Sequence, residues 1–477
     1  IRRAWAVSGL RDNAKVESSN SPIMCRTPTA PSLSQLKPMF AVRRRQRGCM
    51  AALLLLVAAC GVAPPKTGEI GAVEGFLGAA ISEEPRAALV ARDTLSAGGS
   101  AADAAVAAYF AMTVTYPVAV GLGGGGVCLY YDHRSNRAET LDFRVGRAAA
   151  GGHIAIPGAL RGMALLHSRY GHLPWTQLVA PAETMARFGH QISRALAKRL
   201  RPQAGRLRAD GTARRIFLRP DGKPFDESET VVQVELASVL TRIRTRGVSD
   251  LYGGEAGQQF IQAAARRGGK IKISDLRNYR AIWRGTAKTP IGNHVLHLPA
   301  LGKDKNQGGN LLGLVVKTSP SKAGAKVFGS EKMALDVDGG QAGLVIGDSF
   351  GSSVACVFDM NSAFGAATTV PEWGIFMATA AKEDSGGLPV LGVNYHLNQT
   401  VLAVSGAGGP NGSVAAAMVA MDVMERGRTL VDAMAGRRNV KGRVQGLWCP
   451  KGIRTRPGIC QFATDSQWHG LAAFDAF

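Results

Sequence analysis

Two short apolar runs separated by turn-forming residues stand out in residues 334–365. Residues 344–346 (Leu-Val-Ile) and 354–358 (Val-Ala-Cys-Val-Phe) are apolar and rich in β-branched side chains. Between them, residues 348–351 (Asp-Ser-Phe-Gly) have the composition of a turn. The pattern predicts two β-strands joined by a turn.

The first part of the folded region has a different pattern. Residues 86–113 place Ala, Val and Leu three and four positions apart, which predicts helix, and small and polar residues interrupt the pattern at 96–105. Residues 121–126 (Gly-Leu-Gly-Gly-Gly-Gly) then precede an apolar strand at 127–131. Consecutive glycines permit a sharp turn or a close approach of two backbones. A phosphate-binding loop would need a Lys-Ser/Thr pair and a following helix, so we discount that alternative.

The N-terminal residues predict a leader and a signal peptide. Residues 1–38 are polar and rich in Ser and Pro, and we interpret them as a disordered leader or as translation upstream of a start at Met39. Residues 39–60 combine a basic run (43–47), an apolar run too short to span a bilayer (50–57) and a lipobox that ends at Cys60. We expect cleavage before Cys60, acylation of its thiol, and a lipid-anchored protein exported to the periplasmic side of a bacterial cell envelope. The alternative is a buried helix with a chance cysteine.

Composition fits a compact protein, and its charge is unevenly distributed. The chain has 477 residues, 46% of them hydrophobic, and a formal net charge of +22. Length alone predicts one large domain or two to three ordinary ones. Three segments, residues 1–47, 194–219 and 426–456, each carry a net charge of +8. None contains a nucleic-acid-binding motif, so we interpret them as solvated basic faces and expect no nucleic-acid partner.

The seven cysteines contain no CxxC pair and no zinc-ligand spacing. Cys449 and Cys460 enclose ten residues rich in Gly, Pro and Arg. In an oxidising compartment this spacing is that of a candidate disulfide, and the alternative is two unrelated thiols.

Several motifs together resemble the γ-glutamyltransferase (glutathione hydrolase) family of N-terminal nucleophile hydrolases. They include residues 96–105, the glycine run at 121–126, Leu-Asp-Phe-Arg at 141–144 and, in the region that resembles the start of that family's small subunit, Asp348, Gly351, Asn361, Phe364 and Gly365. The resemblance implies an α+β fold, a four-layer αββα sandwich in which residues 61–340 and 341–477 form one domain. Helical stretches followed by strand-turn-strand signals are consistent with that class. The resemblance also implies that no metal or organic cofactor is used.

The resemblance places an unusual residue at the reactive position. Family members cut their own chain before a threonine, which then serves as amine and nucleophile. Counting back from Gly351 puts Gln341 there, followed by Ala342. This chemistry needs Thr, Ser or Cys, and none occurs between residues 331 and 347. We therefore expect neither self-cleavage nor turnover.

Other positions of the family's site are partly kept. The resemblance implies that Arg144 grips the substrate α-carboxylate, for which a guanidinium fork is well suited, although a lone Arg is usually a surface residue. It implies that Asn361 contacts the substrate, although a polar turn residue is an equally good interpretation. It also implies an ammonium-binding carboxylate at Glu383, glycines in place of the hydroxyl clamp at 386–387, and an oxyanion hole formed by the backbone of Gly408 and Gly409.

Three hypotheses follow for function. The protein could hydrolyse or transfer the γ-glutamyl group of glutathione and related compounds, which the residue at 341 argues against. It could bind γ-glutamyl or amino-acid ligands in the cell envelope through Arg144, Glu383 and Asn361 without turnover. It could also be an inert scaffold or the product of a damaged gene.

Overall fold

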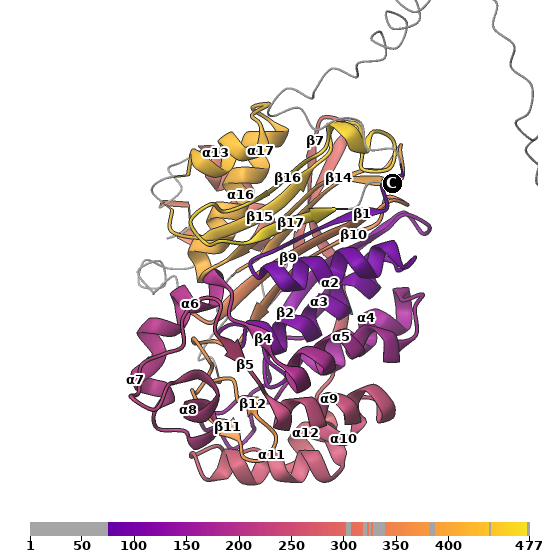
Figure 1. Ribbon diagram of the computed structural model, residues 1–477. Coiled ribbons are helices and arrows are strands. Elements are labelled where there is room, and N and C mark those ends of the chain that lie inside the picture. The colour runs from indigo at the N-terminus through magenta and orange to yellow at the C-terminus, as the bar shows by residue number, and fades with distance from the viewer. Residues whose placement is uncertain are drawn as a thin grey trace, which may run out of the picture. The chain divides into compact units, whose positions relative to one another are not determined.

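A computed structural model describes residues 75–301, 307–317, 322–323, 326–327, 339–380, 387–437 and 440–474 (Figure 1). The leader, the signal peptide, Cys60, Glu383 and Gly386 lie outside the described residues. Residues 67–477 form one compact unit, so the segments on both sides of residue 340 belong to the same unit. No described helix is long and apolar enough to cross a membrane.

The first of two large sheets has seven antiparallel strands in the order β17-β1-β9-β10-β2-β3-β6. Its centre is the β9–β10 hairpin, in which Val345 pairs with Ala355. The strands are β1 (Gly78–Ser82), β2 (Gly125–Asp132), β3 (Arg137–Asp142), β6 (Ile282–Arg284), β9 (Gln341–Asp348), β10 (Ser353–Asp359) and β17 (Leu471–Phe474).

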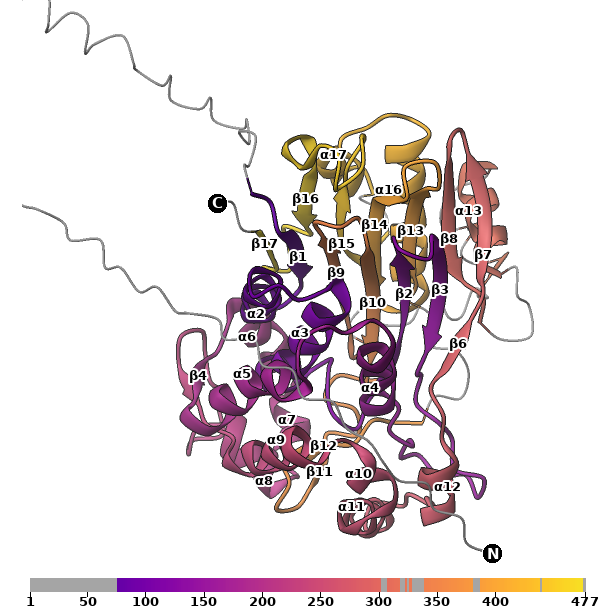
Figure 2. The ribbon, with the colours of Figure 1, turned by 90° about the vertical axis from the view of Figure 1, so that its right-hand side faces the viewer.

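The second sheet has six antiparallel strands in the order β16-β15-β14-β13-β8-β7. The chain passes from the first sheet to the second between β6 and β7, which Figure 2 shows along one side of the molecule. The strands are β7 (Thr286–Ile291), β8 (His294–Pro299), β13 (Pro389–Asn394), β14 (Gln399–Ala407), β15 (Arg443–Trp448) and β16 (Gln461–Thr464).

Helices cover the outer face of the seven-stranded sheet and extend beyond it (Figure 1). They are α2 (Pro85–Ser96), α3 (Ala101–Thr115), α4 (Ala159–Tyr170), α5 (Trp175–Phe188), α6 (Arg194–Leu200), η1 (Arg201–Gln203), α7 (Ala204–Leu207), α8 (Gly211–Phe217), α9 (Val234–Arg246), α10 (Ser249–Gly253), α11 (Glu255–Ala265) and α12 (Ile273–Asn278). Two small strand pairs, β4 (His190–Gln191) with β5 (Thr230–Val231) and β11 (Thr369–Val370) with β12 (Ile375–Phe376), lie among them.

A smaller set of helices covers the outer face of the six-stranded sheet (Figure 1). It consists of α13 (Gln307–Lys317), α16 (Gly409–Met424) and α17 (Leu430–Ala435), and the 3₁₀ turn η2 (Pro457–Ile459) lies between β15 and β16. The order is therefore helices, sheet, sheet, helices. The α+β class that the resemblance implied is confirmed.

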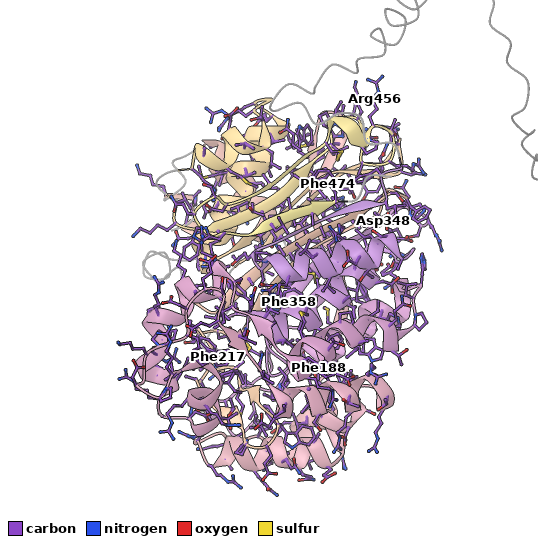
Figure 3. The ribbon with its side chains drawn as sticks, in the orientation of Figure 1. Phe188, Phe217, Asp348, Phe358, Arg456 and Phe474 are labelled. Carbon is purple, nitrogen blue, oxygen red and sulfur yellow. A yellow bond between two sulfur atoms is a disulfide. The ribbon has the colours of Figure 1, made fainter. Side chains whose placement is uncertain are left out.

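Three apolar layers hold this arrangement together, and β9 contributes to two of them. Leu344 and Ile346 face the helices, whereas Val345 faces the other sheet. Successive side chains of a strand point to opposite faces, so a strand buried on both sides needs the continuous apolar run seen in the sequence. Phe358 of β10, labelled in Figure 3, belongs to the helix-facing layer. The third layer lies between the six-stranded sheet and α13, α16 and α17.

The helix pattern of residues 86–113 corresponds to two helices. The Ser100 side chain accepts a hydrogen bond from Asp103 N–H, and the Asp103 carboxylate accepts one from Ser100 N–H, which is a capping box at the start of α3. The glycine run does provide a close backbone approach: a Cβ on Gly125 would lie 2.4 Å from the Val145 nitrogen.

Two disulfides occur in the described residues. Cys449 is bonded to Cys460, the pair that the sequence suggested. Cys128 of β2 is bonded to Cys356 of β10, directly opposite it in the sheet register. These two residues are 228 positions apart, so only the strand pairing brings them together.

Candidate functional site

The side chain of Gln341 lies against Gly408 and Gly409, where the family resemblance implies an oxyanion hole. Gln341 is the first residue of β9 and is 1% exposed. Its side-chain Oε1 accepts hydrogen bonds from the N–H groups of Gly408 (3.0 Å) and Gly409 (2.7 Å). Distances of this size are those expected between oxyanion-hole donors and a developing negative charge. The two N–H groups that were predicted to form an oxyanion hole thus converge on one oxygen, which belongs to a carboxamide of the chain itself.

Local backbone geometry directs both donors at one point. Gly408 and Gly409 have φ angles of +105° and +67°, in the region that favours glycine, and α16 begins at Gly409. Unpaired N–H groups and the helix dipole make a helix N-terminus attractive to oxygen atoms that carry negative charge. The side-chain oxygen of Gln341 accepts hydrogen bonds from two of these N–H groups.

The amide nitrogen of Gln341 is also held. Its Nε2 donates to Asp359 Oδ2 at 2.8 Å, across the antiparallel pairing of Gln341 with Asp359. The other oxygen of Asp359 accepts a hydrogen bond from Asn361 N–H at 2.5 Å. The Asn361 side chain donates to the carbonyl of Thr379 at 2.6 Å. Asn361 thus lies next to the site, and its amide stabilises the local loop.

Two buried arginines hold the backbone of the same residue. Arg199 (3.1 Å) and Arg443 (2.6 Å) both donate to the carbonyl oxygen of Gln341. The side chains of both are fully buried. Glu83 bonds Arg443 Nε at 2.9 Å and accepts from Gly343 N–H at 3.0 Å. The Tyr116 hydroxyl lies 3.3 Å from Arg199, and burial raises its pKa to about 12.

The prediction that the basic runs are solvated is wrong for these two arginines. Other members of residues 194–219 do lie at the surface, where four of them form ion pairs: Arg194–Glu227, Arg201–Asp226, Arg215–Glu235 and Arg219–Glu229. Nothing in the sequence separated the buried members of a basic run from the exposed ones.

Arg144 lies after β3 and is held by its neighbour Asp142. Its Nε and one terminal nitrogen each bond a carboxylate oxygen of Asp142 at 3.0 Å, and Arg284 bonds the same carboxylate. Burial raises the pKa of Asp142, but the hydrogen bonds and charge of Arg144, together with Arg284, outweigh burial and hold that pKa below its usual value. The Arg144 side chain remains 28% exposed. It is therefore orientated and still partly accessible.

Gly387, one of the two glycines that were expected in place of a hydroxyl clamp, borders the carboxamide of Gln341. A Cβ on Gly387 would lie 2.5 Å from Gln341 Oε1, so a side chain could not fit there while Gln341 keeps its position. Gly387 N–H donates to the hydroxyl of Ser413, in the first turns of α16. The Ser413 hydroxyl is therefore engaged by the backbone N–H of Gly387.

The arrangement contains two convergent backbone donors, at Gly408 and Gly409, but no nucleophile at residue 341. Among the described residues, no group of three or more His, Cys, Asp or Glu side chains is placed to hold a metal ion. Asp359, Arg199, Arg443 and Glu83 were missed by the sequence analysis. Asp359 ends an apolar strand two residues before Asn361, and that position was the available signal for it.

The fold agrees with that of known acylases. A cephalosporin acylase from Bacillus halodurans aligns with a TM-score of 0.66 at 18% identity, covering 87% of this chain and 98% of the acylase. The chain has the fold of the N-terminal nucleophile hydrolases.

Sequence comparison relates the first part of the folded region to one family. The model of the γ-glutamyltranspeptidase family matches residues 87–309. Human glutathione hydrolase 7 is 33% identical over 224 residues, which are 43% of this chain and 33% of that protein. The glutathione hydrolase proenzyme of Escherichia coli is 29% identical over 282 residues, 54% of this chain and 48% of that protein. Scoloptoxin SSD14 of Scolopendra dehaani is 30% identical over 261 residues, 50% of this chain and 45% of that protein. Part of the chain is therefore similar to members of the γ-glutamyltranspeptidase family, and the chain spans less than half the length of these relatives.

Proposed function

We propose that this protein is a non-cleaving, non-catalytic member of the γ-glutamyltranspeptidase family. The proposal is supported by the hydrogen bonds of the Gln341 side chain. Its oxygen accepts from both N–H groups that would form the oxyanion hole, and its nitrogen donates to Asp359. A glutamine side chain ends in a γ-carboxamide, the same group that joins a γ-glutamyl residue to its leaving amine. The chain therefore supplies its own copy of the substrate's reacting group and lacks the hydroxyl that would attack it.

The proposal is tested by measuring the intact mass of the purified protein after reduction. We expect one chain that is not cut near residue 340. Two fragments split at that position would refute the proposal and would indicate an active hydrolase or transferase of γ-glutamyl compounds.

A pair of variants tests whether the nucleophile alone is missing. Gln341→Thr with Ala342→Thr should cleave itself before residue 341 and gain hydrolysis of a γ-glutamyl anilide. The matched control, Gln341→Val with Ala342→Thr, has the same branched shape without the hydroxyl and should remain uncut. If the Thr–Thr variant is folded and stays uncut, the site lacks more than the nucleophile, and the glycines that replace the hydroxyl clamp at 386–387 are the first candidates for that loss.

A second candidate function is amino-acid binding, favoured by the partly exposed guanidinium of Arg144. Because Gln341 fills the position of a γ-carbonyl, small amino acids such as L-serine should bind better than glutathione. Calorimetric titration of L-serine into the protein should show binding that Arg144→Gln abolishes. Arg284→Gln is the control, because it bonds the same carboxylate of Asp142. Equal loss in both variants would argue against direct contact of the ligand with Arg144.

We also propose that the protein is exported and anchored to the cell envelope by lipid on Cys60. The two disulfides of the described region favour an oxidising compartment. Metabolic labelling with a radioactive fatty acid should mark the wild type and should not mark Cys60→Ser. Equal labelling of both would refute the anchor.

A further inference from the structure

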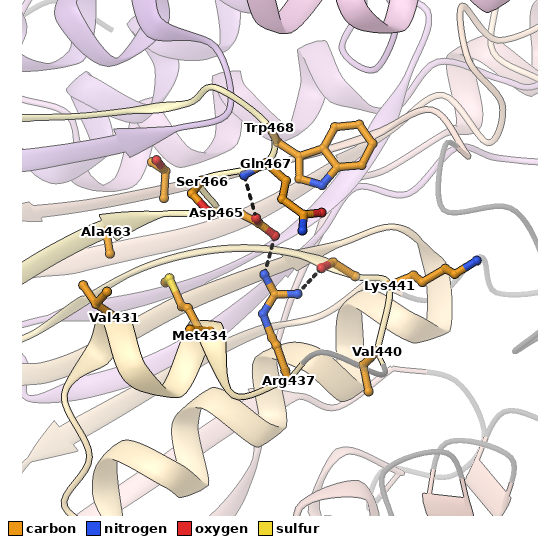
Figure 4. A pocket seen from close by; sticks show the side chains of 13 residues that line it. Val431, Met434, Arg437, Val440, Lys441, Ala463, Asp465, Ser466, Gln467 and Trp468 are labelled. Atoms are coloured by element: carbon orange, nitrogen blue, oxygen red, sulfur yellow. Dashed lines mark hydrogen bonds and ion pairs between the residues drawn. The ribbon is translucent and has the colours of Figure 1, made fainter.

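A pocket of about 630 Å³ opens at the edge of the six-stranded sheet, between α17, β16 and the loop that follows β16 (Figure 4). Pockets that bind small molecules usually have volumes of roughly 300–1,000 Å³. None of the site residues described above lines it. Its lining consists of Val431, Met434, Ala435, Arg437, Val440, Lys441, Gly442, Ala463, Thr464, Asp465, Ser466, Gln467 and Trp468.

The polar walls of the pocket are fixed by hydrogen bonds. Arg437 forms an ion pair with Asp465 and donates to the carbonyl of Gly442, which joins the segment after α17 to the loop after β16. Within that loop, Gln467 N–H donates to the Asp465 carboxylate, and Trp468 N–H donates to the Asp465 carbonyl. Lys198 of α6 donates to the carbonyl of Gln467 at 2.8 Å. The pocket is therefore preformed, which reduces the ordering cost of binding.

One side of the pocket is apolar. Met434, Val440 and Ala463 are less than 10% exposed overall, and Val431 is 61% exposed beside them. Val431 and Met434 come from α17 and lie across from Trp468 in Figure 4. Buried apolar walls with a few placed polar groups are typical of small-molecule sites.

The charge of the lining is positive. Asp465 is the acid of the lining, and Arg437 neutralises it. Lys441 is exposed, and no partner holds its ammonium group in the part of the chain that the structure describes. A further cation lies beside the pocket, Lys198 Nζ at 4.5 Å from the centre of the Trp468 ring. Arg443 lies 5.0 Å from the same centre, and Glu83 neutralises its charge. An anion would gain favourable interactions here, whereas a cation would not.

We propose that this pocket binds a small organic anion, a carboxylate attached to an apolar body. The apolar body packs against Met434, Val440 and Ala463, and the carboxylate lies toward Lys441 and the polar side chains of Gln467 and Trp468. The site is distinct from the one around Gln341. The two are linked by a short path, because Arg443 contacts Trp468 and also donates to the Gln341 carbonyl.

The test is calorimetric titration of the intact protein with 4-phenylbutyrate and, separately, with the neutral 4-phenylbutan-1-ol. We expect saturable binding of one carboxylate per chain and at least tenfold weaker binding of the alcohol. Lys441→Gln should weaken carboxylate binding about three- to fivefold, the size expected of one solvent-exposed charge interaction. Lys451→Gln, an exposed lysine outside the lining, should leave the affinity unchanged.

Two further variants place the ligand in the pocket. Ala463→Trp should fill it and abolish binding. If thermal melting shows that this variant is unfolded, Val431→Glu replaces it, because an exposed carboxylate at the rim should repel the ligand and weaken binding at least threefold. No saturable heat with the wild type, equal affinity for the alcohol, or equal effects of the Lys441 and Lys451 variants would each overturn the proposal.

Discussion

Truncating Gln341 to alanine should destabilise the protein through lost hydrogen bonds. The variant removes the partner of the Gly408 and Gly409 N–H groups and one hydrogen bond of the Asp359 carboxylate, which keeps its bond from Asn361 N–H. Each buried polar group left unsatisfied costs about 1–3 kcal/mol. Gly409 is only partly buried, so water can replace the lost oxygen there. We expect a total loss of about 2–4 kcal/mol in the free energy of unfolding.

The matched control for this experiment is Gln445→Ala. Gln445 lies on β15 and is 1% exposed, and its Nε2 has no hydrogen-bond partner among the described residues. The same atoms are removed, but fewer hydrogen bonds are lost, so the cost should be lower.

Calorimetry measures the difference. With an unfolding entropy of roughly 2.1 cal/mol/K per residue over a unit of about 400 residues, a loss of 3 kcal/mol lowers Tm by about 3–4 °C. Acetamide carries the same carboxamide and should bind the vacated site, raising the Tm of Gln341→Ala and not that of Gln445→Ala. A Gln341→Ala variant as stable as the wild type would refute the view that the carboxamide satisfies the oxyanion hole.

Three further predictions concern stability. Arg443→Met leaves the buried carboxylate of Glu83 without its closest charge partner and should cost about 3–5 kcal/mol in denaturant unfolding; a cost below 1 kcal/mol would contradict this. Burial raises the pKa of Asp348 to about 6, above the roughly 3.9 of an unfolded chain. The contribution of Asp348 to stability is therefore fully present below about pH 4 and is lost as the pH rises through 6. Between pH 4 and pH 7, the free energy of unfolding of Asp348→Asn should therefore rise by about 2 kcal/mol relative to that of the wild type, as measured by parallel urea titrations. Replacing Cys449 and Cys460 by serine should lower the free energy of unfolding by about 3 kcal/mol, because the disulfide restricts the chain entropy of the loop it closes. Adding a reductant should then lower the Tm of this variant less than that of the wild type.

The sequence predicted local structure well where a single element carried the signal. The strands around residue 348 were visible because apolar runs flank turn residues, and β9 and β10 occupy those runs. The backbone of Gly408 and Gly409 could be assigned a role because its donors need no side chain. The bond between Cys449 and Cys460 spans only 11 positions, so local spacing was enough to suggest it.

What could not be predicted depends on contacts between distant segments. The sequence indicated that Gln341 cannot attack an acyl carbon, but not that its side chain reaches across to α16. Likewise, Arg199 and Arg443 are indistinguishable from their exposed neighbours until both are seen on one carbonyl oxygen. The pairing of Cys128 with Cys356 requires the register of two strands far apart in the chain.

That pairing has a practical and an architectural consequence. Cys128 and Cys356 lie on opposite sides of residue 340, so the bond between β2 and β10 ties the two segments of the chain to each other. If a variant cut itself before residue 341, its two pieces would still migrate as one species on a gel until a reductant was added. The pieces would also fail to separate on dilution. A protein that contains this bond can gain a new chain end at its reactive strand and remain a single covalent molecule.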